Sequence, residues 1–486
     1  MIKNNKSKKQ NKIKGSLILQ TLVFGSVAIL IINALASFAA TSVKSSKLTY
    51  IKEQAFQSAE AGVDYYRWHL AHAVSDYQDG TGAPGPYVHT LNDEDGNPVG
   101  QFSLTITPPT SGSTVVNVES TGTSSLDSTQ KRKISTRVAM PSIAENAFAG
   151  NNNMAFGIGT EIYGPVKSNG GIRFDGYAHN IVSSGVTSYN DTDGGACGGN
   201  NSYGVHTCVG ADDPKYPTTL PNRPDVFGAG RLLNQPHIDF SGFTADIGNL
   251  KTIAQTADGF YRAAAGAGFV GYHIVLKTND TFDLYKINSW ASIGSSCDDG
   301  YTTSSWSINN QTLQGNYAFP ANGVIFVQDH LVIDGQVDGG RLTIVAALLP
   351  EPTPSQYKNI IINNDLIYTN MDGTDSIGLV AQGGVMVGLV SDNNLTINGA
   401  LMAQHNAVGR FNYLGNASCI YESRSTLTLY GMIASYARYG FAYGSPASSG
   451  YTTRNINYDA NLLYAPPPSF PLTSNQYQIL SWQEVK

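Results

Sequence analysis

The first 80 residues carry two successive apolar patterns that together predict one long helix. Residues 16–40 are almost uniformly apolar, with scattered Gln, Ser, Thr and Asn. At ~1.5 Å per residue this segment is long enough to cross a hydrocarbon core of about 30 Å. Apolar residues then recur at steps of three and four, which predicts one buried face of an amphipathic helix. That face consists of Leu48, Ile51, Ala55, Phe56, Ala59, Val63, Tyr66 and Leu70. Because no Pro occurs between residues 2 and 80, we expect a single helix over residues 16–77.

Residues 78–141 carry the signals of a loop followed by short strands. Gly, Pro, Asn and Asp crowd residues 78–100, and these residues end a helix. The segments "GQFSLTITPP", "STVVNVESTGTS" and "QKRKISTRVAMP" then alternate apolar and polar residues, the period of a half-buried strand. We expect a small antiparallel sheet laid on the amphipathic helix.

Beyond Pro141 the pattern changes to short β runs that are punctuated by Gly. The segments "LVIDGQV", "LTINGALMA" and "LTLYGMIA" share the form apolar-x-apolar-x-Gly, and "IRFDGYA" is an earlier echo. A Gly at a repeated corner is typical of stacked β coils. We therefore expect an irregular β-solenoid over residues 142–465, although an ordinary β-sandwich would also explain short strands and Gly turns. The fold class is then α+β, with a long helix, a small sheet and a large mainly-β domain.

Two parts of the large domain depart from this pattern. Residues 187–320 are expected to form a loop-rich insertion that contains one helix, in "FTADIGNLKTIAQTADGFYRAAA", and one hairpin that turns at Asn279 and Asp280. The Pro-rich tail, residues 466–486, is expected to run extended over the surface. Four apolar side chains are expected to seal the last coil: Leu462, Phe470, Ile479 and Trp482.

Composition and charge indicate that most of the chain lies outside the cytoplasm. Of 486 residues 14% are charged, while 51 are Gly and 27 are Tyr, which suits a β-rich extracellular protein better than a helical enzyme. Residues 1–14 hold six Lys and no acid, and the remainder holds 24 basic against 36 acidic residues. A basic flank stays on the cytoplasmic side of a membrane. The acidic remainder argues against nucleic acid as a partner.

The cysteines are the first candidates for special chemistry. Cys197, Cys208, Cys297 and Cys419 allow three pairings, and buried free thiols are the alternative. Outside the cytoplasm disulfides are favoured, and Cys197–Cys208 would close a Gly/Asn-rich loop. Just before that loop, Asp191 and Asp193 in "DTDGG" are a candidate calcium site, but turns of this composition are more often plain turns, and we expect no cofactor.

Two further groups bear on function. Polysaccharide-acting enzymes need paired carboxylates on one face, and the nearest cluster is Asp329, His330, Asp334, Asp338 and Arg341. Because Asp334 and Asp338 flank Gly turns, we expect solvated rather than catalytic side chains. Tyr436, Tyr439 and Tyr443 belong to an aromatic string that is a candidate surface for carbohydrate or protein, although at least half of the string should fill strand faces.

The N-terminal residues resemble a known family. Lys14-Gly15 before a long apolar helix resembles the signal of type IV prepilins, and "EQAFQSAEAG" resembles the Q-A-x-x-A-A-E-A-G segment of PilX-type minor pilins and tip pseudopilins of type II secretion. The resemblance implies that residues 1–15 are a leader removed by prepilin peptidase, leaving Ser16 as the N-methylated terminus. It also implies helix packing with other pilins, in which Gln20 would take part. Glu60, near the point where the helix meets the globular region, is a further candidate for such packing, although a solvated surface acid is the more common case.

One residue departs from the family pattern. Most pilins have Glu at the fifth mature position, thought to pair with the terminal amine of a neighbouring subunit, whereas this chain has Gln20. An amide can accept a hydrogen bond from that amine but cannot neutralise it. The departure favours a subunit at or near a filament tip over a repeated one.

The sequence thus predicts a non-catalytic minor pilin or pseudopilin. It would be anchored in the cytoplasmic membrane and then displayed on a filament, with its β domain priming assembly or contacting carbohydrate, a host or an abiotic surface. The alternatives are a β-solenoid enzyme that acts on polysaccharide, anchored or secreted after a cut near Thr41 in "SFAATS", and a surface scaffold tethered by one helix.

Overall fold

The computed structural model describes residues 16–109, 113–193, 197–294, 296–297, 304–413, 419–443, 449–474 and 476–485. Its contacts divide the chain into two compact units. Met1–Thr107, Val118–Thr136 and Trp482–Lys486 form the first, which we call the helix–sheet unit. Pro108–Asn117 and Arg137–Ser481 form the second, which we call the β body.

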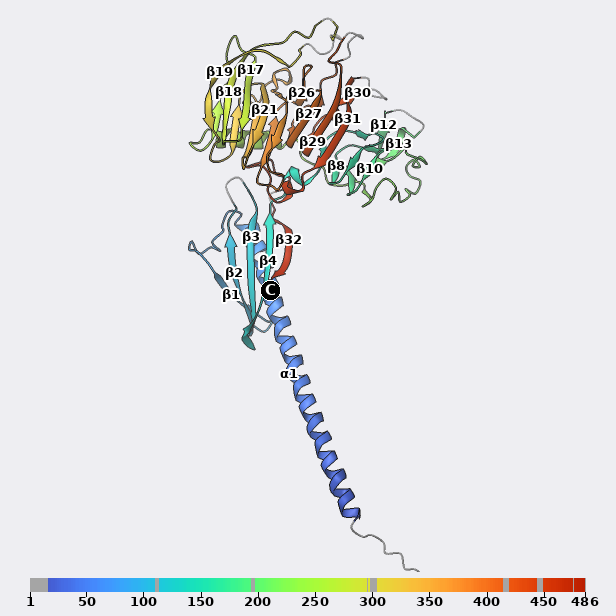
Figure 1. Ribbon diagram of the computed structural model, residues 1–486, viewed down its shortest axis with the longest axis vertical. Helices are drawn as coiled ribbons and strands as arrows, with labels where there is room; N and C mark the ends of the chain where they lie inside the picture. The colour runs from blue at the N-terminus through green and yellow to red at the C-terminus, as the bar shows by residue number, and fades with distance from the viewer. Residues whose placement is uncertain are drawn as a thin grey trace, which may run out of the picture. The chain divides into compact units, whose positions relative to one another are not determined.

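Helix α1 runs without a break from Ser16 to His72 (Figure 1). The single helix is confirmed, and it ends five residues before the predicted position 77. The chain turns there because the Asp76 carboxylate accepts hydrogen bonds from the backbone N–H of Gln78 (2.8 Å) and Gly80 (2.7 Å). Of the predicted face, six side chains are buried: Ile51, Ala55, Ala59, Val63, Tyr66 and Leu70. Leu48 is exposed and Phe56 is half-buried, so the face is confirmed except at these two residues.

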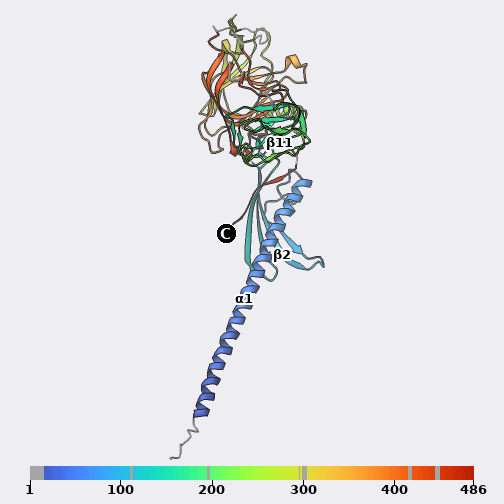
Figure 2. The ribbon, with the colours of Figure 1, turned by 90° about the vertical axis from the view of Figure 1, so that its right-hand side faces the viewer.

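The sheet of the helix–sheet unit has five strands in the order β1-β2-β3-β4-β32. Its strands are β1 (Tyr87–Asn92), β2 (Pro98–Thr107), β3 (Val116–Ser124), β4 (Asp127–Ala139) and β32 (Gln478–Val485). Strands β1 and β2 pair antiparallel, with Tyr87 opposite Leu104. The C-terminal part of α1 lies along this sheet, mainly against β2 (Figure 2).

Small residues line the contact between α1 and the sheet. A Cβ atom on Gly62 of α1 would lie 2.2 Å from Ser120 Oγ, and one on Gly100 would lie 2.2 Å from Ser58 Oγ. Gly122 leaves even less space, because its Cβ would lie 2.1 Å from the carbonyl oxygen of Ala55. The small residues of "QAFQSAEAG" therefore let the helix backbone approach the strands closely. Ser120 and Gly122 lie inside β3, not in a turn between strands.

The C-terminal residues correct the expectation for the tail. Gln478–Val485 does not seal a coil of the β body but forms the edge strand β32 beside β4. The Trp482 ring meets the Phe56 ring edge-on with centroids 6.0 Å apart, and Glu484 pairs with Arg132. The β body is thus inserted in the sequence between the last two strands of the sheet. The alternating pattern of "QILSWQEV" does not reveal this partner, because β4 lies far away in the chain.

Trp482→Ala is expected to lower the stability of the helix–sheet unit by about 1 kcal/mol, the scale of a lost edge-on aromatic pair. Gln483→Ala, at an exposed neighbour on the same strand, is the matched control and should change stability by less than about 0.5 kcal/mol. Urea unfolding followed by far-UV circular dichroism measures both. Equal effects of the two changes would contradict the role given to β32.

A long parallel sheet dominates the β body. Among the described residues, ten strands pair in parallel, each with the next in the order given below. They are β16 (Phe260–Arg262), β20 (Val324–Val327), β22 (Arg341–Ala346), β25 (Ser376–Ala381), β27 (Asn394–Ala403), β29 (Ser423–Ser435), β5 (Phe148–Gly150), β8 (Val166–Ser168), β11 (Val182–Ser184) and β15 (Arg231–Leu232). Their inward side chains, mostly Val, Ile, Leu and Phe, form the main core.

Further parallel ladders run beside this sheet. One contains β17 (Gly271–Lys277), β21 (Leu331–Val337), β24 (Leu366–Tyr368), the first halves of β27 and β29, and β31 (Ser449–Tyr458) (Figure 1). Another contains β23 (Ile360–Ile361), β26 (Val385–Val387) and β28 (Val408–Arg410). Shorter ones pair β6 (Met154–Phe156), β9 (Ile172–Phe174) and β14 (Val205–His206), and β7 (Glu161–Ile162) with β10 (Tyr177–Ala178).

The repeated Gly of the sequence marks a change of partner along a strand. The first half of β27 pairs with β24 at Leu366, whereas its second half pairs with β25 from Ala400 onward. Gly399 lies between these halves and is in register with Gly431 of β29. A Cβ at Gly431 would lie 1.8 Å from the carbonyl oxygen of Gly399, so only Gly fits in this close stack.

The remaining elements lie in or near the predicted insertion. Helix α2 (Phe243–Ala254) confirms the first half of the predicted helix, whereas the second half is wrong, because Phe260–Arg262 forms strand β16. The hairpin of β17 with β18 (Thr281–Trp290) is confirmed, and β19 (Ile308–Ala318) pairs antiparallel with β18. The region is less loop-rich than predicted, because β16 and β17 join the parallel sheets. Two small antiparallel pairs are β12 (Ser188–Asp191) with β13 (Gly199–Tyr203), and β30 (Ala442–Tyr443) with β31. Short 3-10 turns are η1 (Ile143–Glu145), η2 (Pro354–Gln356) and η3 (Ala460–Leu463).

Candidate functional site

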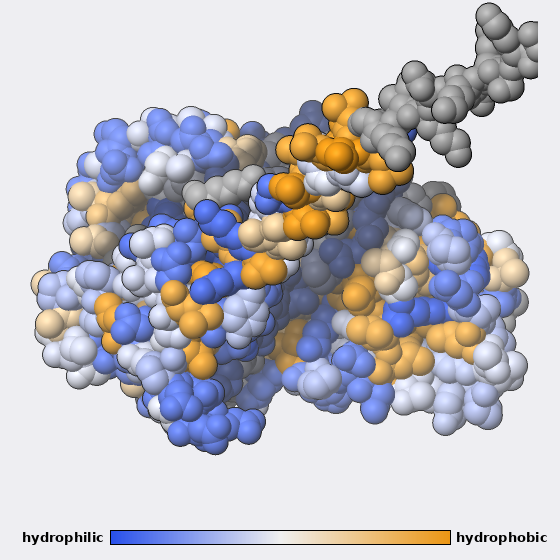
Figure 3. Space-filling model, turned by 90° about the horizontal axis from the view of Figure 1, so that it is seen from below, coloured by the Kyte–Doolittle hydropathy of each residue, from blue (hydrophilic) through white to orange (hydrophobic). Residues whose placement is uncertain are grey.

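The N-terminal half of α1 is an exposed apolar rod. Each of its large apolar side chains is at least 45% exposed. They are Leu17, Ile18, Leu19, Leu22, Val23, Phe24, Val27, Ile29, Leu30, Ile31, Ile32, Leu35 and Phe38. Figure 3 shows this end of the helix as a mainly apolar surface with a few more polar residues between the apolar ones. The helix is long and apolar enough to cross a membrane. Such a surface needs lipid or other apolar helices around it.

The residues expected to act in processing and packing lie along this rod. Gly15 falls outside the described residues, and Ser16 is the first residue of α1. Gln20 is exposed within the apolar half. Glu60 is exposed in the amphipathic half, where the opposite face of the helix contacts the sheet. Both side chains are therefore available to another helix, and their roles in packing stay predictions.

The three candidate contact tyrosines are half-buried and turn inward. Tyr436 packs at 6.0 Å from the Phe240 ring, and Tyr439 packs at 4.9 Å from the Phe148 ring. The Tyr443 hydroxyl donates to the carbonyl oxygen of Arg410 at 2.7 Å. These side chains fill the β body and do not form an exposed aromatic surface.

The cysteines form two disulfides in the structure. Cys197 is bonded to Cys208 across a separation of 11 residues, and Cys297 is bonded to Cys419 across 122 residues. His206 lies beside the first bridge, and its ring reaches the two sulfur atoms closely enough to suggest a metal site. However, both ring nitrogens already face oxygen atoms, Nε2 towards Asp191 Oδ2 at 3.1 Å and Nδ1 towards the Tyr203 carbonyl at 3.3 Å. The bridge and the histidine thus form a structural cluster.

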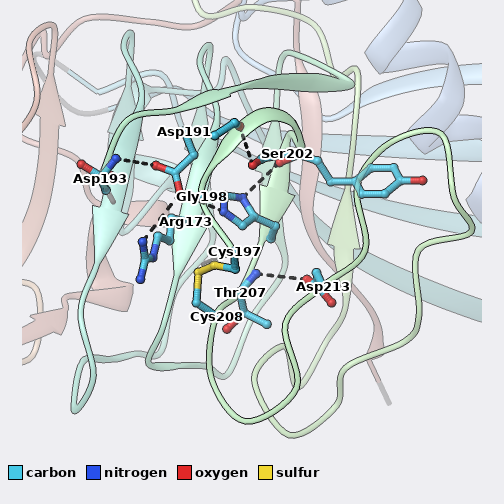
Figure 4. Close-up of polar contacts among 12 residues, drawn as sticks. Arg173, Asp191, Asp193, Cys197, Gly198, Ser202, Thr207, Cys208 and Asp213 are labelled. Atoms are coloured by element: carbon cyan, nitrogen blue, oxygen red, sulfur yellow. Dashed lines mark hydrogen bonds and ion pairs between the residues drawn. A yellow bond between two sulfur atoms is a disulfide. The ribbon is translucent and has the colours of Figure 1, made fainter. Parts of the chain in front are cut away.

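Charged side chains surround the Cys197–Cys208 bridge and compensate one another (Figure 4). Arg173 donates to Asp175 at 2.7 Å and lies 3.7 Å from Asp191. Asp175 in turn accepts the backbone N–H of Cys208 at 2.8 Å. Burial lowers the pKa of His206, while the Asp191 carboxylate acts in the opposite direction. The network links Arg173, Asp175 and Asp191 to the two residues Cys208 and His206.

Asp191 and Asp193 do not converge on a common cation site. The Asp191 side chain is 1% exposed and faces His206 and Arg173, whereas Asp193 pairs with Arg438 on the surface. Cationic side chains therefore occupy the places that calcium would take. Both residues resemble structural carboxylates rather than ligands.

Asp191→Asn is expected to destabilise the β body by about 2 kcal/mol, because it removes a charged, buried hydrogen-bond acceptor. Asp193→Asn is the matched control at the surface and should cost less than about 1 kcal/mol. Thermal unfolding of each variant, with and without calcium, checks both points. A calcium-dependent rise in the melting temperature that Asp191→Asn abolishes would contradict this assignment.

The acidic cluster considered for catalysis is spread over separate structural contacts. Asp329 accepts from Lys358 Nζ at 3.1 Å and from the backbone N–H of Ala265 at 3.0 Å. Asp334 contacts His273 Nε2 at 3.1 Å, and Asp338 accepts from Asn370 at 2.9 Å. Arg341 donates to the Pro466 carbonyl at 2.6 Å. Asp338 is exposed as expected, whereas Asp334 is buried rather than solvated, because His273 and Asn364 pack against its carboxylate. Each carboxylate has its own structural partner, so the arrangement does not resemble a pair of catalytic carboxylates.

Two buried arginines, Arg410 and Arg424, were not predicted from the sequence. Arg410 is fully buried, and it donates to the carbonyl oxygens of Glu422 (2.9 Å), Leu389 (3.2 Å) and Tyr421 (2.6 Å). Arg424, also buried, donates to the same Leu389 carbonyl at 3.3 Å. Burial lowers the pKa of Arg410 to about 10. No local pattern signals such residues, because Arg is usually exposed.

Comparison with known proteins finds likenesses among solved structures. No protein-family model matches the chain, and no curated protein matches its sequence. Among solved structures, the chain is similar to the competence-associated pilin ComZ from Thermus thermophilus, with 14% identity over 90% of this chain and 97% of that chain. The TM-score is 0.27, so this likeness carries no argument about the function of the chain. The pilin resemblance therefore depends on the residues of this chain.

Proposed function

We propose that this chain is a non-catalytic minor pilin or pseudopilin. The observation that carries the proposal is the two-part helix α1, whose first half is exposed and apolar and whose second half packs on an antiparallel sheet. A secretory signal is removed by cleavage, so we would not expect it to be continuous with the main helix of a folded unit. A helix that serves both as an anchor and as a structural element must be retained.

The apolar half supplies the driving force for assembly. In the cytoplasmic membrane it is solvated by lipid, with the basic residues 1–14 on the cytoplasmic side. Leaving the bilayer would expose its side chains to water. This exposure costs a free energy of about 25 cal/mol for each Å² of apolar surface. That cost is avoided when the rod packs against the helices of other pilins. We propose such packing, after removal of residues 1–15 by prepilin peptidase, as the route to a filament.

Gln20 and the β body bear on the position in the filament. Gln20 can accept a hydrogen bond from a neighbouring terminal amine without neutralising it, which favours a tip subunit. The β body supports the same position, because a bulky domain is accommodated more easily at an end than between repeated subunits. We interpret its long parallel sheet and Gly corners as an irregular β-solenoid, displayed for assembly priming or for contact with a surface.

Fractionation of cells that carry the chain tests this function. Sheared surface filaments should contain the protein together with other pilin-like chains. Gly15→Leu should block processing and keep the protein in the membrane fraction, whereas Lys14→Arg, the matched control, preserves the charge and should be assembled. Release of the Gly15→Leu protein into filaments, or recovery of the parent protein free in the medium, would contradict the proposal.

A further inference from the structure

A partly enclosed cavity of about 250 Å³ lies in the β body, and we call it the Glu145 cavity. Its walls come from η1, from β8, from the segment just before α2, and from residues near 473. The cavity is lined by side chains of both charges: Glu145 and Asp239 are acidic, and Lys167 is basic. It is separate from α1 and plays no part in the function proposed above.

Glu145 presents a carboxylate with few partners. It is the last residue of η1, and its side chain is mostly withdrawn from solvent. Burial raises the pKa of Glu145, and Lys167 acts in the opposite direction. The hydroxyl of Thr473 lies 3.5 Å from Glu145 Oε1, at the outer limit of a hydrogen bond. The remaining hydrogen-bonding capacity of this half-buried carboxylate is therefore open to water or to a ligand.

Lys167 faces the same cavity from β8. Its neighbours Val166 and Ser168 are buried, and Lys167 itself is half-buried. Among the described residues it has no ion pair within 4.0 Å, so it does not reach Glu145. Other half-buried lysines of the β body are satisfied: Lys286 donates to the Ala265 carbonyl at 2.8 Å, and Lys358 pairs with Asp329. Lys167 and Glu145 thus place opposite charges in the wall of the same cavity, but the two side chains do not form an ion pair with each other.

The geometry points to the Glu145 cavity as the binding site of a small zwitterion, an α-amino acid whose ammonium group meets Glu145 and whose carboxylate meets Lys167. A single ion would compensate only one of the two charges, whereas a zwitterion compensates both. The cavity volume also suits an α-amino acid. Sites for drug-sized ligands have volumes of ~300–1,000 Å³, and an amino acid is smaller than such ligands. Asp239 is a second carboxylate in the cavity wall, and it accepts hydrogen bonds from Ser241 and from the backbone N–H of Gly242.

Titration calorimetry on the full chain in detergent tests this site. Glycine, L-alanine, L-glutamate and L-lysine are the probes, and ethylamine and propionate represent the two halves of alanine. At least one amino acid should bind saturably, and alanine should bind at least about tenfold more tightly than ethylamine or propionate. Absence of saturable binding for all four amino acids at about 10 mM would overturn the inference.

Two variants locate the binding. Glu145→Gln and Lys167→Met should each weaken amino-acid binding at least about tenfold. Glu161→Gln and Lys131→Met, at exposed positions away from the cavity, are the matched controls and should bind like the parent. If Glu145→Gln fails to fold, Lys167→Met decides alone. Unchanged affinity in Lys167→Met would place the ligand elsewhere and overturn the assignment.

Discussion

Gly122→Val is expected to separate α1 from its sheet and to unfold the helix–sheet unit. Any side chain at this position would place its Cβ 2.1 Å from the carbonyl oxygen of Ala55 and 2.3 Å from the backbone nitrogen of Ala59. Backbone atoms of a helix cannot move aside individually, so the whole helix must shift away from β3. Overpacking against neighbouring side chains lowers stability by about 1–3 kcal/mol, and a clash with backbone atoms lowers it further. We therefore expect the free energy of unfolding to fall by at least about 3 kcal/mol.

The neighbouring Thr121 offers the matched control. It lies on the same strand with its side chain on the opposite, half-buried face. Thr121→Val places the same Val side chain on the same strand, but on the face that points away from α1. Amide hydrogen exchange of residues 51–70 reports the helix contact directly, and protection should fall in Gly122→Val alone. A Gly122→Val protein that melts within about 2 °C of the parent would show that the close packing is not required.

Loss of the Cys297–Cys419 bridge is expected to destabilise the β body by about 5 kcal/mol, against about 3 kcal/mol for Cys197–Cys208. The difference follows from the unfolded chain, because the first bridge closes a separation of 122 residues and the second a separation of 11. A longer closed loop removes more conformational freedom from the unfolded state.

The two paired Ser variants, Cys297→Ser with Cys419→Ser and Cys197→Ser with Cys208→Ser, provide the comparison. Each is the control for the other, since both remove one bridge from the same body. Denaturant unfolding gives the two losses, and peptide mapping without reduction checks the pairing itself. Equal losses, or a mapped peptide that joins Cys208 to Cys297, would contradict the assignment.

Local periodicity accounts for what could be predicted. The buried face from Ile51 to Leu70 follows from the spacing of apolar residues in a helix, which needs no information about distant parts. The repeated Gly likewise marked Gly399 and Gly431, which are register partners in adjacent strands. The sequence also indicated the hairpin at Asp280, where the backbone has a positive φ of 56°.

The missed features all depend on distant partners. Strand β32 pairs with β4 across most of the chain, and its short alternating pattern reads equally well as a surface tail. The aromatic residues near Tyr439 were predicted as a candidate contact surface, but aromatic side chains do not reveal which side of a strand faces the core. Arg410 is buried where carbonyl oxygens from two other segments, Leu389 and the pair Tyr421 and Glu422, accept its N–H groups, and no local pattern indicates this.

The most direct test of the account is the intact mass and N-terminal sequence of the mature protein from cells. Retention of the rod predicts a chain that begins at Ser16 and carries a methylated terminal amine, so that all of α1 remains. A mature chain that begins near Thr41 would lack the apolar half of α1, and it would contradict both the membrane anchor and assembly through helix packing.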